Sequence, residues 1–135
     1  MIVIDASSLS KYLLKEENWQ EVRKYLAMGV YSVDHIIKEV SNAIWKHTVL
    51  FNRITKDTAT ILHKQLKRMV EEEILILEPE NLYVDKAFKI SLNHKITFYD
   101  SIYLAQALKY GELLTSDQKQ AEISKKLNIK THHIK

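Results

Sequence analysis

The chain has no cysteine, only one proline and only two glycines among its 135 residues. Without cysteine it can form neither a disulfide nor a thiolate metal site, which excludes zinc bound through sulfur and favours a reducing compartment. With so few breakers, the chain is expected to be mostly helical, with short strands and tight connections. It also lacks a long apolar segment and a basic leader, so we expect a cytoplasmic protein with no membrane span.

Length and charge set broad limits on what the chain can be. At 135 residues and 46% hydrophobic, the sequence suits one domain spanning residues 1–135 and is too short for two ordinary ones. The formal net charge of +3 favours a polyanionic partner only weakly, because many proteins of this charge never bind nucleic acid. Charge alone therefore decides nothing about function.

Short apolar runs alternate with amphipathic helical stretches along the whole chain. This alternation predicts an α/β fold whose parallel sheet is covered by helices on both faces. We expect strands at residues 2–4, 30–33, 74–77, 113–115 and 130–133. We expect helices at residues 7–14, 17–27, 34 to about 50, 57–73, 82–93, 101–110 and 118–127.

Four acidic residues, Asp5, Glu39, Asp100 and Asp117, stand where their predicted elements would aim them at one place. Asp5 and Asp117 follow the first and fourth strands, and ligands bind beyond the carboxyl ends of strands in open parallel sheets. Taken one at a time, Asp5, Asp100 and Asp117 could each simply cap a helix. Glu39 lies in mid-helix, on the shoulder of the buried stripe, and its plain alternative is a solvated glutamate paired with a lysine.

Convergence of four carboxylates would require a counter-ion. Ionised carboxylates within several ångströms of one another repel, raise one another's pKa and destabilise the fold unless a cation lies among them. Oxygen ligands without cysteine match Mg²⁺ or Mn²⁺ better than structural zinc. The pattern therefore predicts a site for a hard divalent ion.

Four short strings are spread from one end of the chain to the other, namely Asp5-Ala-Ser7 after an apolar strand, Glu39 with Asn42, Tyr99-Asp100-Ser-Ile-Tyr-Leu-Ala105, and Leu114-Thr-Ser-Asp117. Together they resemble the PIN domain, and within it the VapC-type toxin nucleases of toxin–antitoxin pairs. Any one string is weak, but their order and spacing together are fairly specific. The resemblance implies a three-layer α/β/α sandwich with a short parallel sheet of four or five strands, in which strands one and four are neighbours.

The resemblance also implies a function and the residues that perform it. The expected activity is an Mg²⁺- or Mn²⁺-dependent endoribonuclease acting on single-stranded RNA. The family's catalytic and metal-binding acids correspond to Asp5, Glu39, Asp100 and Asp117, with Ser7, Asn42 and Thr115 in support. The candidate RNA-binding cations are Lys46, Arg53 and Lys119, with Lys11 and Lys56 as further flanks. Many relatives carry another acid after the fourth, where this chain has Gln118 and Gln120, so one metal or two stays open.

VapC-type proteins act with a partner, so a small antitoxin and a homodimer are expected from the same resemblance. Tyr12 and Trp19 are the candidate partner contacts, because large aromatics on a second helix face often mark such surfaces. Two alternatives remain, a non-catalytic PIN-like interaction or regulatory protein and a stand-alone RNA-processing nuclease. Nucleotide-cofactor binding is disfavoured, since two glycines supply neither a G-x-G-x-x-G nor a Walker loop.

Overall fold

The five predicted strands all form in the computed structural model, which describes residues 1–135, and they build one parallel sheet. The strands are β1 (Val3–Ile4), β2 (Val30–Val33), β3 (Leu75–Glu78), β4 (Glu112–Thr115) and β5 (Lys130–His133). Their order across the sheet is β3-β2-β1-β4-β5, and every pair is parallel. The predicted α/β class with a parallel sheet is confirmed.

Helices fill each connection between consecutive strands. Between β1 and β2 lie α1 (Ala6–Leu13) and α2 (Trp19–Leu26), and between β2 and β3 lie α3 (His35–Trp45), its π-helical continuation η1 (Lys46–Leu50) and α4 (Lys56–Glu71). Between β3 and β4 lie the 3₁₀ turn η2 (Glu80–Tyr83), α5 (Val84–His94) and α6 (Phe98–Tyr110), and α7 (Gln118–Lys126) joins β4 to β5. No helix is both long enough and apolar enough to cross a membrane.

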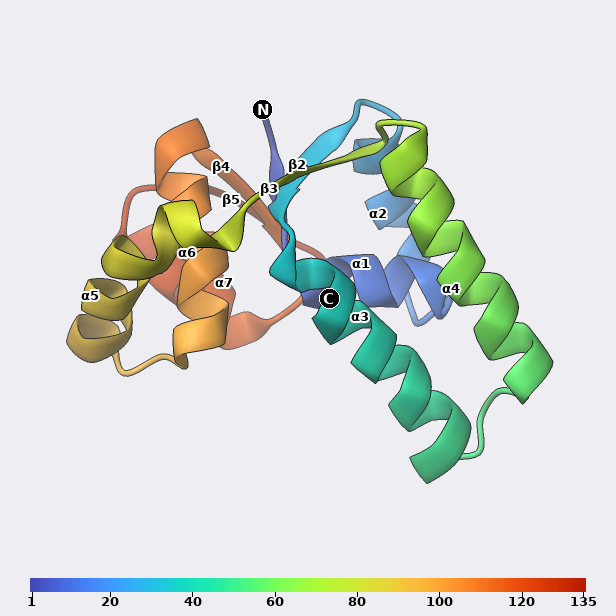
Figure 1. Ribbon diagram of the computed structural model, residues 1–135. Helices are drawn as coiled ribbons and strands as arrows, with labels where there is room; N and C mark the ends of the chain where they lie inside the picture. Colours follow the sequence, from blue (N-terminus) through green and yellow to red (C-terminus); the bar gives the residue numbers. More distant parts are fainter.

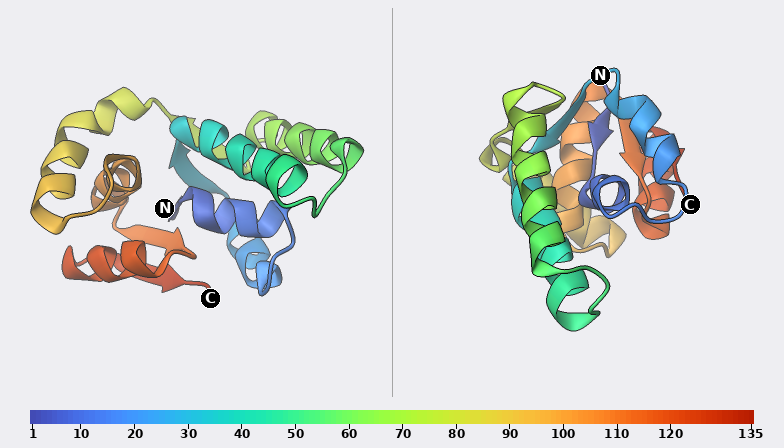
Figure 2. Two further views of the ribbon diagram at one scale, coloured as in Figure 1. Left: turned by 90° about the horizontal axis from the view of Figure 1, so that it is seen from below. Right: turned by 90° about the vertical axis from the view of Figure 1, so that its right-hand side faces the viewer.

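The sheet separates two layers of helices. Connections between parallel strands are right-handed, so the direction in which the chain moves across the sheet decides which face its helices cover. The chain moves one way from β1 to β3 and the other way from β3 to β5, which puts α1–α4 on one face and α5–α7 on the other (Figures 1 and 2). This is the three-layer α/β/α sandwich expected from the resemblance.

Strand β1 lies at the centre of the sheet and pairs with β4, although more than a hundred residues separate them. Val3 is in register with Leu113 and Ile4 with Leu114, and the Asp5 N–H continues the ladder by donating to the Leu114 carbonyl at 3.2 Å. The strand order reverses at this pair, and such a switch point is where open α/β sheets bind ligands. The residues that follow β1 and β4 are thereby brought together.

Helix α6 packs against β1, β2 and β4 and is buried on almost every side, since all seven residues from Ser101 to Ala107 are buried. Its first turn begins at Phe98, three residues before the predicted start at 101. The reason is that the Thr97 hydroxyl accepts the Asp100 N–H at 3.2 Å and caps the helix. Asp100 is therefore free of the capping role that sequence allowed it.

Of the aspartates at the starts of α1, α3, α4 and α7, only two cap the helix with their side chain. Asp5 accepts the Ser8 N–H at 3.1 Å and Asp117 accepts the Gln120 N–H at 2.7 Å, so both acids do cap helices. Asp34 does not cap α3 and accepts the Glu80 N–H at 3.0 Å instead. Helix α4 is capped by Thr55, not by Asp57.

The scarcity of glycine is visible at the turns. The two glycines, Gly29 and Gly111, have φ of +77° and +88° and end α2 and α6 just before strands. Six other left-handed positions are occupied by residues with a side chain, namely Lys15, Asn18, Asn52, Glu73, Lys95 and Asn128. A left-handed backbone costs a residue with a Cβ about 1–2 kcal/mol, so the backbone is slightly strained at each of these six positions.

Glu73→Gly tests this at the exposed end of α4, where φ is +59°. Removing the Cβ relieves the left-handed strain, and after the larger chain entropy of unfolded glycine is subtracted we expect a gain of about 0.5–1 kcal/mol. The matched control is Glu71→Gly, which removes the same charge at the last residue of the helix, where the backbone is α-helical, and should lower stability by about 0.5–1 kcal/mol. The measurement is the free energy of unfolding in urea, and equal signs for the two variants would contradict the prediction.

Candidate active site and a separate groove

The four carboxylates singled out in the sequence line one pocket of about 420 Å³ at the carboxyl ends of β1 and β4. Asp5 follows β1, Asp117 follows β4, Glu39 comes from α3 and Asp100 from the first turn of α6. Asp5 is buried, Glu39 and Asp100 are half-buried and Asp117 is exposed. Glu16, which is exposed, also lines the pocket, so the pocket has one buried acid and four acids that reach toward solvent.

Asp5 is held by hydrogen bonds on both carboxylate oxygens. Its Oδ1 accepts the Ser7 hydroxyl at 2.7 Å and the Ser8 N–H at 3.1 Å. Its Oδ2 accepts the Thr115 hydroxyl and the Gln120 amide at 3.1 Å. Ser7 and Thr115, the two hydroxyl residues expected to support the site, both contact Asp5.

Burial strongly affects the charge of this group. Desolvation raises the pKa of Asp5 to about 7, although hydrogen bonds from Thr115, Ser7 and Ser8 oppose the rise and the charge of Asp100 adds to it. The pKa of Asp100 is also raised, first by burial and then by the charges of Glu39 and Asp117, against the hydrogen bond with Thr97. Repulsion among the acids therefore acts in the expected direction, but burial is the larger cause.

Glu39 is oriented by Tyr103, a residue whose role was missed in the sequence. The Tyr103 hydroxyl donates to Glu39 Oε1 at 2.6 Å, and its own pKa is raised by burial and by the Glu39 charge, so it stays a donor. His35 Nε2 lies 3.4 Å from the same oxygen, while its ring stacks on Tyr99 with centroids 4.8 Å apart. Tyr103 stands three residues after Asp100, a spacing that places both on one helix face and that could have indicated it.

Gln120 is the second residue whose role was missed. It stands three residues after Asp117, the spacing of a capping box, and its N–H does donate to Asp117 Oδ1. Its side chain, however, donates to Asp5 Oδ2 at 3.1 Å instead of returning to the main chain of Asp117. A neutral amide therefore contacts the buried acid in a chain that lacks the additional acid of many relatives.

Several predicted site residues lie elsewhere. Asn42 is exposed and does not line the pocket, nor do Lys46 and Arg53, whose guanidinium lies over the Phe51 ring at 4.9 Å. Lys119 donates to the Lys95 carbonyl at 2.7 Å. Lys11 lines the pocket, but it is buried and its ammonium donates to main-chain oxygens of Glu17 and Lys135.

The pocket suits a hard cation by its chemistry but is not a preformed cage. No group of three or more His, Asp or Glu side chains is arranged to hold a metal ion. The available donors are carboxylate and hydroxyl oxygens, which Mg²⁺ and Mn²⁺ prefer, and the one lysine in the lining is committed to main-chain oxygens. Binding would require the acids to turn inward, with Asp5 giving up one of its four hydrogen bonds.

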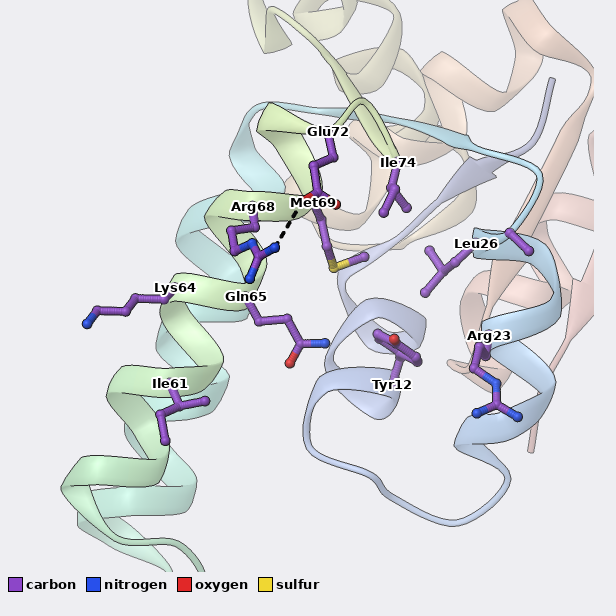
Figure 3. A pocket seen from close by; sticks show the side chains of 11 residues that line it. Tyr12, Arg23, Leu26, Ile61, Lys64, Gln65, Arg68, Met69, Glu72 and Ile74 are labelled. Atoms are coloured by element: carbon purple, nitrogen blue, oxygen red, sulfur yellow. Dashed lines mark hydrogen bonds and ion pairs between the residues drawn. The ribbon is translucent and has the colours of Figure 1, made fainter.

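A larger groove of about 810 Å³ lies between α4 on one side and α1 and α2 on the other (Figure 3). Its apolar lining includes Leu26, Met69 and Ile74, and Arg23, Lys64 and Arg68 add positive charge. Tyr12, one of the two expected partner contacts, lines it. Trp19 does not, and packs against Tyr12 with ring centroids 6.1 Å apart.

With this geometry in place, comparison with known proteins identifies the family. The sequence model of the PIN domain matches residues 2–126, and the chain belongs to the PIN domain family. It is 29% identical over 124 residues to Ribonuclease VapC3 of Pyrobaculum aerophilum, covering 90% of this chain and 92% of that protein. The crystal structure of PAE2754 from Pyrobaculum aerophilum superposes with a TM-score of 0.66 at 24% identity, over 97% of this chain and 92% of that one, which supports the fold.

The raised pKa of Asp5 predicts a pH-dependent stability in metal-free protein. Between the unfolded value near 3.8 and the folded value of about 7, the folded state holds a proton that the unfolded state has released, so stability falls as pH rises. Between pH 5 and pH 7 the loss should be roughly 2 kcal/mol, and it should be absent in Asp5→Asn.

The matched control is Asp57→Asn, an exposed change of the same type in α4, which should keep the pH dependence of the parent. Unfolding free energies would be measured in chelator at several pH values. Parallel curves for the parent and Asp5→Asn would show that Asp5 is ionised normally in the folded protein.

Proposed function

We propose that this chain is an endoribonuclease that hydrolyses single-stranded RNA with Mg²⁺ or Mn²⁺ and is the toxin of a toxin–antitoxin pair. The observation that carries the proposal is the pocket of four carboxylates, one of them buried with a pKa of about 7, in a chain of the PIN domain family. The similarity to a protein named as a VapC ribonuclease supports the RNA substrate and the toxin role.

The carboxylates of Asp5 and Asp100 are the first candidates to hold the ion, with Glu39 and Asp117 completing the site directly or through water. A divalent ion bound there would activate water and neutralise charge on the phosphoryl oxygens. Ser7 and Thr115 hold the Asp5 carboxylate in place, and Tyr103 fixes one oxygen of Glu39. These contacts preorganise the acids before substrate arrives.

The proton of the attacking water needs an acceptor among the same side chains. One of the four carboxylates would take that proton, since the pocket lining contains no histidine. No side-chain nucleophile is evident, and a divalent ion held by the acids would activate water in preference to the 2′-hydroxyl of RNA. With water as the attacking group and the 3′ oxygen as the leaving group, the products carry a 5′-phosphate and a 3′-hydroxyl.

A non-catalytic PIN-like interaction protein is the main alternative from another class. Such a protein would not need a carboxylate in a position where burial disfavours its charge, as at Asp5. Perturbed acids in a pocket are more typical of functional sites, although structural networks also perturb pKa values. The complete set of four acids around one pocket therefore favours catalysis.

Purified protein should cleave single-stranded RNA only with Mg²⁺ or Mn²⁺, and chelation should abolish the activity. Asp100→Asn should lower the rate by at least ~10²-fold, the usual size of losing one preorganised electrostatic contact. Asp57→Asn, exposed and outside the pocket, should cut at the parental rate. Equal rates for the parent and Asp100→Asn, prepared free of host nuclease, would refute the assignment.

We further propose that the groove between α4 and α1–α2 binds the antitoxin. Apolar lining with three cations and one acid, Glu72, fits an amphipathic segment with an apolar face and acidic neighbours. The Arg68–Glu72 pair at 3.2 Å leaves Arg23 and Lys64 to meet those acids (Figure 3). The expected homodimer stays a prediction, for which Phe88 and Leu92, exposed on neighbouring turns of α5, offer an apolar surface.

Ile61 lines the groove and is 63% exposed, so Ile61→Glu should not disturb the core. It should weaken the complex with the product of any small gene adjacent to this one by at least ~10-fold, because a buried charge replaces an apolar contact. Leu82→Glu, equally exposed at 64% but outside the groove, is the control. Complex mass and RNA cleavage would be measured after co-expression, and a gene product that neither co-purifies nor suppresses cleavage would favour a stand-alone RNA-processing nuclease.

A further inference from the structure

A second polar pocket, of about 550 Å³, adjoins the acidic one. Ser116 lines both, so the two pockets share a wall at the end of β4. The remaining lining comes from α7 and from the end of β5 and beyond, and comprises Gln118, Ala121, Glu122, Lys125, His133 and Lys135. We call it the α7–β5 pocket.

The α7–β5 pocket has the charge that the acidic pocket lacks. Lys125, His133 and Lys135 supply three basic side chains, and none of their side-chain nitrogens makes a hydrogen bond or ion pair within the chain. The one acid, Glu122, accepts a hydrogen bond from Gln118 at 3.2 Å. By contrast, Lys11 and Lys119, nearer the acids, are already bound to main-chain oxygens.

A polyanion that enters the acidic pocket needs such a place beside it. Each nucleotide of RNA carries a phosphate, and contacts of lysine with phosphate supply most of the sequence-independent affinity. The five acids that line the first pocket repel phosphate wherever no cation neutralises them. The adjoining pocket has basic side chains with no partner within the chain, and these supply positive charge for the neighbouring phosphate of the RNA strand.

We propose that the α7–β5 pocket binds a backbone phosphate of single-stranded RNA adjacent to the one cleaved, with Lys125 as its principal contact. The proposal rests on the nuclease function and names the part of the chain that holds its substrate. None of the lining residues is Trp, Tyr or Phe and His133 supplies the one aromatic ring, so lysine–phosphate contacts outweigh base stacking in this pocket. The pocket therefore contacts the RNA backbone and adds affinity without sequence preference.

The test compares two charge reversals on neighbouring exposed residues of α7. Lys125→Glu alters the pocket, whereas Lys126→Glu makes the same change in net charge outside it. Affinity for a labelled single-stranded RNA is measured by fluorescence anisotropy in chelator at several salt concentrations. Lys125→Glu should weaken binding roughly five- to tenfold more than Lys126→Glu and should reduce the slope of log K against log salt by about 0.7, the value for one phosphate contact on a single strand.

Cleavage gives a second readout under Mn²⁺. A dinucleotide has only the phosphate that is cut, so the parent and Lys125→Glu should cut it equally, whereas a longer RNA should show a higher KM with Lys125→Glu. If Lys125→Glu and Lys126→Glu change affinity and salt slope equally, the α7–β5 pocket does not bind phosphate as proposed. If the parent still cleaves RNA in that case, the nuclease function stands without the pocket. A selective loss of binding in Lys125→Glu with no cleavage by the parent would keep the pocket and remove the nuclease.

Discussion

A buried carboxylate at the junction of β1 and β4 is the constraint around which the candidate site is built. Asp5 takes hydrogen bonds from Ser7 and Ser8 on α1, and from Thr115 and Gln120 on the far side of the sheet's switch point. Each unpaired buried polar group would cost about 1–3 kcal/mol. The β1–β4 pairing and the beginnings of α1 and α7 therefore have to be correct together for this one side chain to be tolerated.

Much of the fold could be predicted because its signals are local. The segments at residues 30–33 and 130–133 became strands with the predicted bounds, and the apolar run at 113–115 gained only Glu112. The late start assigned to α6 has a clear cause, since Thr97 and Asp100 are both good cap residues and sequence alone does not choose between them. The pairing of β1 with β4 is not a local signal, and its expectation came from the resemblance to PIN domains.

The parts of the site that sequence missed depend on neighbours distant in the chain. Tyr103 meets Glu39 across 64 positions and Gln120 meets Asp5 across 115. The spacing of Tyr103 from Asp100 could have placed Tyr103 near the site, but no spacing within one element predicts its contact with Glu39 or that of Gln120 with Asp5. The environment of the basic residues depends on distant neighbours too. A lysine is useful to a substrate only if its ammonium is uncommitted, and that depends on the carbonyl groups that the fold brings near Lys11 and Lys119.

Gln120 links two parts of the molecule through one residue. Its N–H donates to Asp117 in the cap of α7, and its side-chain N–H donates to Asp5. Its side-chain oxygen is buried without a hydrogen-bond partner. A ligand that binds Oδ2 of Asp5 would displace the Gln120 amide, whose side chain would then have no hydrogen-bond partner. This loss would destabilise the present position of α7. Because such coupling is reciprocal, any change that stabilises the first turn of α7 would also change the affinity of the site for that ligand. Occupancy of the acid pocket and order in the first turn of α7 thus form a single coupled equilibrium, which slow amide exchange in that turn would register.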